Sequence, residues 1–213
     1  MTRQTIRFAA VPFVLFCVWM ALTFTGQLAG FDRFGLLAFR DADLMPLGGD
    51  TGVTVVTAIT HLGDTITLLV LSLATIGFLL LRGDRKVALH GALAIAGLFL
   101  LSPLLKILFG RARPDLVEHL VHASSNSFPS GHAIRALAIY LLVVVLLRPF
   151  LAPAVRKPVL IGAIILALAT GISRLYLGVH WPTDVIASWL AALFWLALWW
   201  RWLDGLGRQT HKS

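Results

Sequence analysis

Charged residues are scarce in this sequence. Only 13% of its 213 residues are Asp, Glu, Lys or Arg, whereas 58% are hydrophobic. Soluble domains carry about 25% charged residues, so a membrane protein is indicated instead. Cysteine is nearly absent as well: Cys17 stands alone, which excludes an internal disulfide and leaves the redox compartment undetermined. The chain also lacks internal repeats and low-complexity linkers, and its length suits one compact helical bundle, so residues 1–213 are interpreted as a single domain.

Acidic residues are the rarer of the two signs of charge. There are 10 Asp and Glu against 18 Lys and Arg, which gives a formal net charge of +8. In a soluble protein this balance would suggest a nucleic-acid partner. In a membrane protein, Lys and Arg collect in cytoplasmic loops, and that explanation requires no nucleic acid.

Long apolar runs are abundant. About 20 residues cross the hydrocarbon core, so the runs predict six transmembrane helices, some of which extend into flanking residues. Arg3 and Arg7 before the first run resemble a signal peptide, but the run is too long and no clear cleavage site follows, so we expect a retained helix. The six runs are Phe8–Gly30, Thr65–Leu81, Val87–Leu105, Ala133–Leu147, Pro158–Ser173 and Val185–Trp200.

The segment between the first two runs, residues 31–64, contains two apolar pieces at 34–39 and 53–60. Both are too short to cross a bilayer. They are expected to form interfacial or partly re-entrant helices. The predicted fold class is therefore all-α: a polytopic bundle of six transmembrane helices, with short interfacial helices between the first and the second.

The distribution of Lys and Arg predicts the orientation. Six spans place both termini on one side, and that side receives eleven of the 18 basic residues. By the positive-inside rule, both termini are expected in the cytoplasm. The eleven are Arg3, Arg7, Arg82, Arg85, Lys86, Arg148, Arg156, Lys157, Arg201, Arg208 and Lys212.

Three polar stretches interrupt the hydrophobic pattern. In the first, at the end of the third run, Lys106 and Arg113 are seven residues apart, so a continuing helix places both on one face before Pro114. Alternatively, both are interfacial anchors that reach for head groups.

The second stretch is Pro-Ser-Gly-His, which ends at His132 directly before the fourth run. Ser130 suits the N-cap of that helix, and Gly131 allows close approach to the backbone. A helix N-terminus is a natural anion site. The alternative is an ordinary cap beside an interfacial histidine.

The third stretch runs from Ser173 to Asp184. Pro182 suits the first turn of the sixth helix, which places His180 just before the helix and Asp184 within its first turn. These two side chains can then meet, and a carboxylate on one imidazole nitrogen makes the other more nucleophilic. The alternative is a solvated histidine with a capping acid.

All three stretches map to the outer face. Three cations, Lys106, Arg113 and Arg174, together with a helix N-terminus describe a phosphate site. His132 and His180 on either side describe a general acid and a nucleophile.

The ordered set K-x6-R-P, P-S-G-H and S-R-x5-H-x3-D, with its motif core at residues 106–184, resembles the signature of the type 2 phosphatidic-acid phosphatase superfamily. The resemblance implies that His180 forms a phosphohistidine, that Asp184 orients it and that His132 is the acid. It further implies no cofactor or metal ion, and a phosphate clamp made of Lys106, Arg113, Ser130, Gly131 and Arg174.

The implied activity is hydrolysis of a membrane lipid phosphate at the extracytoplasmic face of a bacterial inner membrane. The implied substrates are undecaprenyl pyrophosphate, phosphatidylglycerol phosphate and phosphatidic acid, and the sequence does not rank them. Two alternatives remain open: a phosphotransferase that uses the same intermediate, and a non-catalytic lipid-binding or transport protein. The bilayer and the lipid are the expected partners, while the oligomeric state stays open.

Three further polar residues near the motifs have no assigned role. His119 and His122, beside Asp115 and Glu118, are interpreted as a solvated loop that contacts the head group, in preference to a metal site. Arg135, one turn into the fourth predicted helix, contacts a second phosphate or Asp184, or else anchors the helix at the interface.

Overall fold

The computed structural model describes residues 3–209, with side chains described for residues 9–200. Within this range all regular structure is helical, apart from an isolated bridge between Arg40 and Pro46. The helices are α1 (Arg3–Phe24), α2 (Ala29–Leu37), α3 (Gly49–His61), α4 (Thr65–Leu81), α5 (Arg85–Phe109), α6 (Gly131–Leu147), the short 3-10 helix η1 (Arg148–Phe150), α7 (Pro153–Tyr176) and α8 (Pro182–Gln209).

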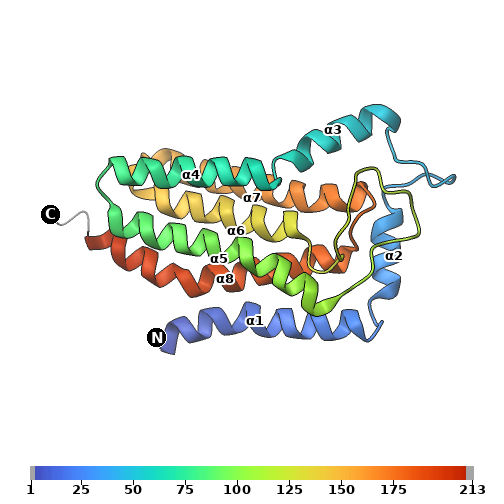
Figure 1. Cartoon of the computed structure of the whole chain (residues 1–213), viewed down its shortest axis with the longest axis horizontal. Coiled ribbons are helices and arrows are strands. Elements are labelled where there is room, and N and C mark those ends of the chain that lie inside the picture. Colours follow the sequence, from blue (N-terminus) through green and yellow to red (C-terminus); the bar gives the residue numbers. More distant parts are fainter. Residues whose placement is uncertain (1–2, 210–213) are drawn as a thin grey trace.

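Six long helices, α1 and α4 to α8, run side by side along the molecule (Figure 1). Five segments of the described chain are long and apolar enough to cross a membrane, with α3 and α4 counted as one segment. The pair α1 and α2, bent by 89°, makes a sixth span when it is counted as one. The predicted all-α, six-helix fold is confirmed, and the chain is a multi-pass membrane protein.

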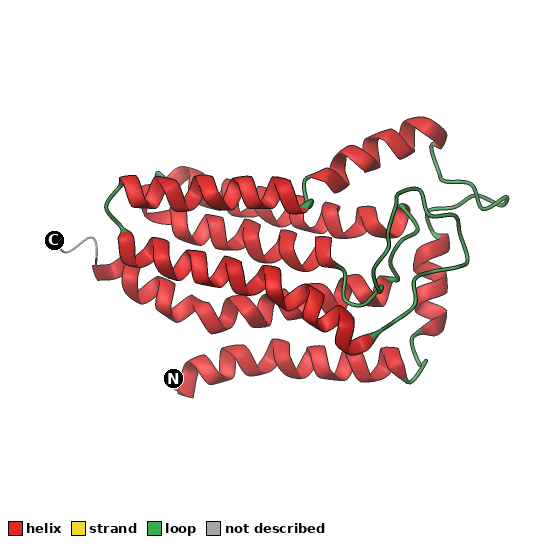
Figure 2. Ribbon diagram, in the orientation of Figure 1, coloured by secondary structure: helices red, strands yellow, loops and turns green. Residues whose placement is uncertain are grey.

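The two ends of the bundle differ. Both chain termini and the α4–α5 connection lie at one end, whereas α2, α3 and the long loop between α5 and α6 lie at the other (Figure 1). The irregular segments gathered at this second end are shown in Figure 2. We call it the loop end. All three motif stretches reach it, at the end of α5, the start of α6, and the end of α7 with the start of α8.

The first helix ends earlier than expected. We predicted an apolar run to Gly30, but α1 stops at Phe24 and the chain turns through residues 25–28 before α2 begins. Gly26 has φ of +78°, a left-handed conformation that favours glycine, and the Thr25 hydroxyl donates to the carbonyl of Ala21. The last part of the apolar run therefore belongs to the turn and to α2, which crosses the loop end.

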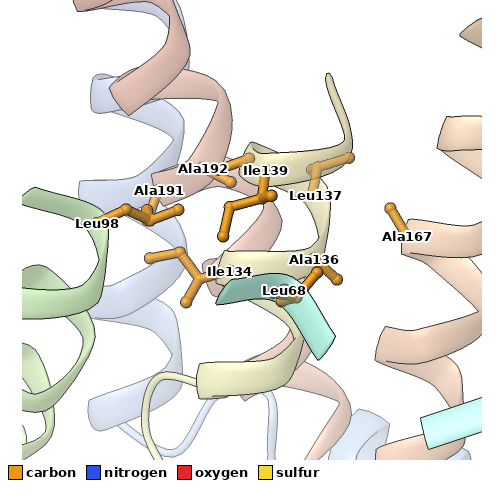
Figure 3. Packing of buried hydrophobic residues seen from close by; sticks show 10 residues of the cluster. Leu68, Leu98, Ile134, Ala136, Leu137, Ile139, Ala167, Ala191 and Ala192 are labelled. Atoms are coloured by element: carbon orange, nitrogen blue, oxygen red, sulfur yellow. The ribbon is translucent and has the colours of Figure 1, made fainter. Parts of the chain in front are cut away.

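Helix α6 is the centre of the bundle and packs against α4, α5, α7 and α8. Its larger side chains, including Ile134 and Ile139, meet Leu68 and Leu98 from neighbouring helices (Figure 3). Small residues at the contacts let the backbones approach closely, as is typical of membrane bundles. These small residues are Ala136 and Ala138 of α6, Ala167 of α7, and Ala191 and Ala192 of α8. The motif at the start of α6 thus begins on a helix that is fixed from several sides.

The segment that leads into α6 is also fixed in place, by an aromatic cluster around Phe128. Phe128 is fully buried, and its ring packs against those of Phe16, Phe24 and Phe109 at centroid distances of 5.0–6.3 Å. These partners come from α1 and α5. The aromatic cluster therefore fixes the position of the Ser130–His132 segment relative to the end of α5.

Candidate active site

The predicted site residues gather at the loop end, although they come from four helices, α5 to α8, and from the segments that connect them. Lys106 lies in the last turn of α5, Arg113 in the loop that follows, and Arg174 in the last turn of α7. Lys106 lies within electrostatic range of Arg113, Arg174 and Asp184, and of Arg135. The three motif stretches therefore form one site.

His180 is buried, with a side chain only 2% exposed. Its Nδ1 lies 3.5 Å from Oδ2 of Asp184 and 3.4 Å from the hydroxyl of Ser127. Its Nε2 lies 3.5 Å from a terminal nitrogen of the Arg113 guanidinium. One ring nitrogen thus faces a carboxylate and the other a cation, which is the orientation predicted for a nucleophile beside a phosphate site.

The electrostatic surroundings keep this imidazole neutral. Burial, which opposes the charged form, lowers the pKa of His180 to about 3, and the positive charges of Arg113 and Lys106 act in the same direction. Asp184 opposes the shift without reversing it. A neutral imidazole has a free electron pair at neutral pH, as nucleophilic attack requires.

Asp184 is fully buried and satisfied by several donors. Its Oδ2 accepts the Ser127 hydroxyl at 2.5 Å and the backbone N–H of Trp181 at 2.9 Å, while Oδ1 pairs with Arg111. Arg111 also pairs with Asp32 at 2.6 Å. The carboxylate that faces His180 is therefore fixed by two side chains of the α5–α6 loop and by the backbone directly before α8.

Asp32 extends this network to α2. Its two oxygens accept the backbone N–H of Thr183 at 2.9 Å and the Thr183 hydroxyl at 2.8 Å. Asp32 is 3% exposed. Helix α2 is thereby tied both to Arg111 and to the first turn of α8, where Asp184 lies.

Lys106 and Arg113 hold the loop that precedes α6. The ammonium group of Lys106 donates to the carbonyl of Asn126 at 2.6 Å and to the Ser125 hydroxyl at 3.1 Å. The guanidinium of Arg113 donates to the carbonyls of Ser125 at 2.7 Å and Val179 at 2.5 Å. In the described part of the chain, neither cation is paired with a carboxylate, so both charges are available to an anion.

Two buried polar atoms at the site have no hydrogen-bond partner among the described residues. Arg174 donates through one terminal nitrogen to the Thr60 hydroxyl at 2.8 Å, but its Nε is unpartnered, and so is the hydroxyl of Ser130. Leaving such groups unpaired costs about 1–3 kcal/mol each. A phosphate oxygen would satisfy both kinds of group.

Ser130 occupies the predicted N-cap position of α6, yet its side chain makes no capping hydrogen bond. The expectation was right for the position and wrong for the side chain, because the hydroxyl is buried in the bundle. The first N–H groups of α6, including that of Gly131, are therefore not satisfied by this side chain. Such a helix start retains its capacity to bind an anion.

His132 contacts a residue that no motif includes. Its Nε2 lies 2.8 Å from Oδ1 of Asp64, and Oδ2 of the same carboxylate lies 2.6 Å from Nδ1 of His61. Arg174 and Arg135 lie within electrostatic range of His132 as well.

The remaining polar residues are placed as follows. His119 Nε2 lies 2.7 Å from the carbonyl of Pro114, within its own loop, and His122 is exposed. Among residues 9–200, whose side chains are described, there is no group of three or more His, Cys, Asp or Glu that could hold a metal ion. Arg135 lies over the ring of Phe99 at 5.6 Å, and its Nε has no partner in the described chain.

Sequence reasoning missed several residues of this site. Arg111 lies within the first motif stretch and Ser127 two residues before the second. Their closeness to the motifs in the sequence was the only indication that they belong to the site. Asp32, Thr60 and Asp64 lie in the segment between the first two spans, which carries no motif. The only signal there was the presence of acids in an otherwise apolar region.

Comparison with known proteins agrees with this geometry. A family model described as the PAP2 superfamily matches residues 85–208. The chain is 39% identical over 137 residues to phosphatidylglycerophosphatase B of Bacillus subtilis (strain 168), covering 63% of this chain and 66% of that protein. It is 35% identical over 127 residues to undecaprenyl-diphosphatase BcrC of the same organism, covering 57% and 60%. The matches thus span less than two thirds of these relatives.

A solved structure is similar over nearly the whole chain. The crystal structure of a transmembrane PAP2 type phosphatidylglycerolphosphate phosphatase from Bacillus subtilis matches with a TM-score of 0.79 and 30% identity. The match covers 95% of this chain and 96% of that chain. The likeness therefore includes the short helices at the loop end as well as the motif core.

Proposed function

The chain belongs to the PAP2 superfamily, and on that premise we propose that it is an integral-membrane lipid phosphatase. It hydrolyses a phosphomonoester or pyrophosphate of a membrane lipid through a phosphohistidine on His180. The observation that carries the proposal is the placement of His180: Nδ1 lies 3.5 Å from Asp184 and Nε2 lies 3.5 Å from Arg113. A phosphoryl group held by the guanidinium would lie next to the attacking nitrogen.

In the first step, His180 Nε2 attacks phosphorus and the bond to the leaving oxygen breaks. His132 gives its proton to that oxygen, so the lipid leaves as an alcohol, or as a monophosphate if the substrate is a pyrophosphate. Lys106, Arg113 and Arg174, with the Ser130 hydroxyl and the Gly131 N–H, neutralise the three equatorial oxygens. Phosphoryl transfer requires such positioning and charge neutralisation more than covalent assistance.

In the second step, water attacks the phosphorus of the phosphohistidine. His132, now neutral, takes a proton from this water, and the bond from phosphorus to His180 Nε2 breaks to release inorganic phosphate. Both histidines return to their starting states. Asp184 orients His180 in both steps, because the hydrogen bonds that its carboxylate accepts from Ser127 and Trp181 prevent it from turning away.

The names of the relatives guide the choice of substrates. They are a phosphatidylglycerophosphatase and an undecaprenyl-diphosphatase, so a phosphomonoester and a diphosphate both enter the proposal, together with phosphatidic acid. The alternative is a phosphotransferase that passes the phosphoryl group from His180 to a second lipid instead of water.

The proposed location is the inner membrane of a bacterium, with the loop end on the extracytoplasmic side. The basic residues support this orientation, because Lys and Arg collect in cytoplasmic loops: Arg82 lies in the α4–α5 connection and Arg148 in the α6–α7 connection. Both connections lie at the end that carries the termini, away from the site (Figure 1).

The test is phosphate release by the purified chain in detergent, with each of the three lipids supplied separately and no lipid acceptor added. Release from at least one lipid is expected for the wild type and not for His180→Ala. A wild type that releases phosphate only when an acceptor lipid is present would establish the transferase. Binding without release under either condition would contradict both proposals.

A further inference from the structure

Asp64 directly precedes helix α4, at a position where an acid usually caps the helix N-terminus. Here it occupies the N-cap position of α4 but makes no side-chain capping hydrogen bond. Its two oxygens are used elsewhere: Oδ1 meets His132 at 2.8 Å and Oδ2 meets His61 at 2.6 Å. The ordinary structural role of an N-cap acid therefore does not explain this side chain.

The turn that carries Asp64 is held against the helices of the site. The hydroxyl of Tyr140 on α6 donates to the carbonyl of Leu62 at 2.7 Å. Gly63 lies so close to α7 that an added Cβ would overlap Cγ2 of Thr170, so a side chain there would force the turn away. These contacts bring the carboxylate of Asp64 to the imidazole of His132.

The charges around His132 make this carboxylate important. Arg174 from α7 and Arg135 from α6 are both cations within electrostatic range of the imidazole. Asp64, from the α3–α4 turn, is the carboxylate in contact with the imidazole and carries the opposite charge. His61 lies on the far side of Asp64 and is 63% exposed, so it faces solvent and not the phosphate site.

We propose that Asp64 is a positioning residue for the general acid: it accepts the Nε2 proton of His132 and so directs Nδ1 toward the leaving oxygen. The negative charge of Asp64 also offsets the positive charges of the two arginines near His132. The site then has two histidine–carboxylate pairs with separate tasks. Asp184 supports the nucleophile, and Asp64 supports the acid. This inference rests on the phosphatase activity proposed above.

A positioning role predicts a change in the pH profile as well as in the rate. The alkaline limb of kcat/KM reports the acid in the free enzyme, and removal of an opposite charge at this distance shifts such a group by about one pH unit or more. Asp64→Asn should therefore move the alkaline limb to lower pH. Phosphate release from lipid should fall more than about tenfold, but less than the about 10²–10⁴-fold that general acid catalysis supplies in total.

The experiment compares purified full-length wild type, Asp64→Asn and Asp64→Glu on a lipid phosphate and on p-nitrophenyl phosphate. The activated ester needs little help from an acid, so Asp64→Asn should lose much less activity on it than on the lipid. Asp64→Glu retains the charge and should keep the alkaline limb near that of the wild type. Asp50→Asn is the matched control, since it removes an exposed acid from the start of α3 and should change neither quantity.

An unshifted alkaline limb in Asp64→Asn, with equal losses on both substrates, would overturn the inference and leave Asp64 a purely structural role. An Asp64→Glu profile displaced as far as that of Asp64→Asn would overturn it too. Both results presuppose a wild type that releases phosphate from lipid. A wild type without that activity would instead contradict the proposed function, so the two failures are distinguishable.

Discussion

Arg111 pairs with Asp184, the carboxylate beside the proposed nucleophile, through one terminal nitrogen of its guanidinium. The other terminal nitrogen pairs with Asp32 of α2 at 2.6 Å. A planar guanidinium can satisfy two carboxylates at once, whereas an ammonium is a single point of charge. The orientation of the catalytic carboxylate therefore depends on a residue that does not touch the substrate in our proposal.

Replacement of Arg111 should separate stability from catalysis. Arg111→Ala leaves two buried carboxylates without a counter-charge, and removal of one partner of a buried pair typically costs about 3–5 kcal/mol. We expect a lower Tm in detergent, measured by tryptophan fluorescence. Arg111→Lys should keep more of the stability but lose kcat, because it cannot hold both acids. Arg33→Ala, an exposed arginine of α2, is the control. Full activity in Arg111→Lys would contradict the positioning role.

Replacement of His180 and replacement of His132 should affect activity in different ways. A nucleophile cannot be bypassed, so His180→Ala should be inactive on every substrate. His132→Ala should lose about 10²–10⁴-fold on lipids, recover much of the first step with p-nitrophenyl phosphate, and accumulate phosphate on His180. Asp184→Asn should fall between them. The measurement is acid-labile, alkali-stable labelling with phosphate. Label on His132 would reverse the assignment.

Phosphate release should persist in EDTA. Lys106, Arg113 and Arg174 already supply positive charge around the proposed phosphate position, so the transferred group needs no divalent ion for neutralisation. The measurement is the rate of release from lipid after dialysis against the chelator. Complete loss that only a divalent ion restores would argue against the phosphohistidine and return attention to His119 and His122.

Reporter fusions should place the loop end outside. Because most basic residues lie at the terminal end, reporters fused after Ser213 and within residues 82–86 are expected to be cytoplasmic, and one within residues 115–126 extracytoplasmic. The measurement is the activity of compartment-specific reporters in cells. An outward reporter at the C-terminus would overturn both the orientation and the side of the site.

Stability should depend on pH through His180. Its pKa is about 3 in the folded protein, against about 6.5 for an unperturbed histidine, so between these values the unfolded chain binds the extra proton. The free energy of unfolding therefore falls as the pH drops from about 6.5 toward 3, by at most about 1.4 kcal/mol per pH unit from this group. The Tm of the wild type should decrease more between pH 7 and pH 5 than that of His180→Gln. Equal decreases would show that His180 does not contribute.

The sequence predicted what is encoded locally. Apolar runs located the long helices, because a bilayer demands about 20 apolar residues, and the motif spacing located Lys106, His132 and His180 at one end. Helix ends were less predictable. Thr25 and Gly26 stop α1 inside an apolar run, since their local hydrogen bonding and left-handed backbone outweigh hydropathy.

Long-range contacts were beyond the sequence. Asp64 precedes an apolar run, and nothing nearby distinguishes it from an ordinary helix cap. Its meeting with His132 depends on how the α3–α4 turn packs against α6 and α7, through Gly63 and Leu62. Asp32 likewise reads as one acid in a short amphipathic helix, and its role depends on contact with Thr183, 151 residues away.

The separation of Asp32 from Thr183 in the sequence has a consequence for the order in which the site assembles during synthesis. Asp32 emerges early in synthesis, whereas both of its partners, Arg111 and Thr183, are added later, the second of them only with the last helix. Contacts between distant parts of a chain form late, because a large loop must close before they are gained. Insertion of α8 therefore completes the ion-pair network and brings Asp184 to His180 in the same event. A chain that stops before α8 still contains His180, but it lacks Asp184 beside that histidine and Thr183 beside Asp32, so in our proposal it would hold the attacking imidazole without the carboxylate that orients it.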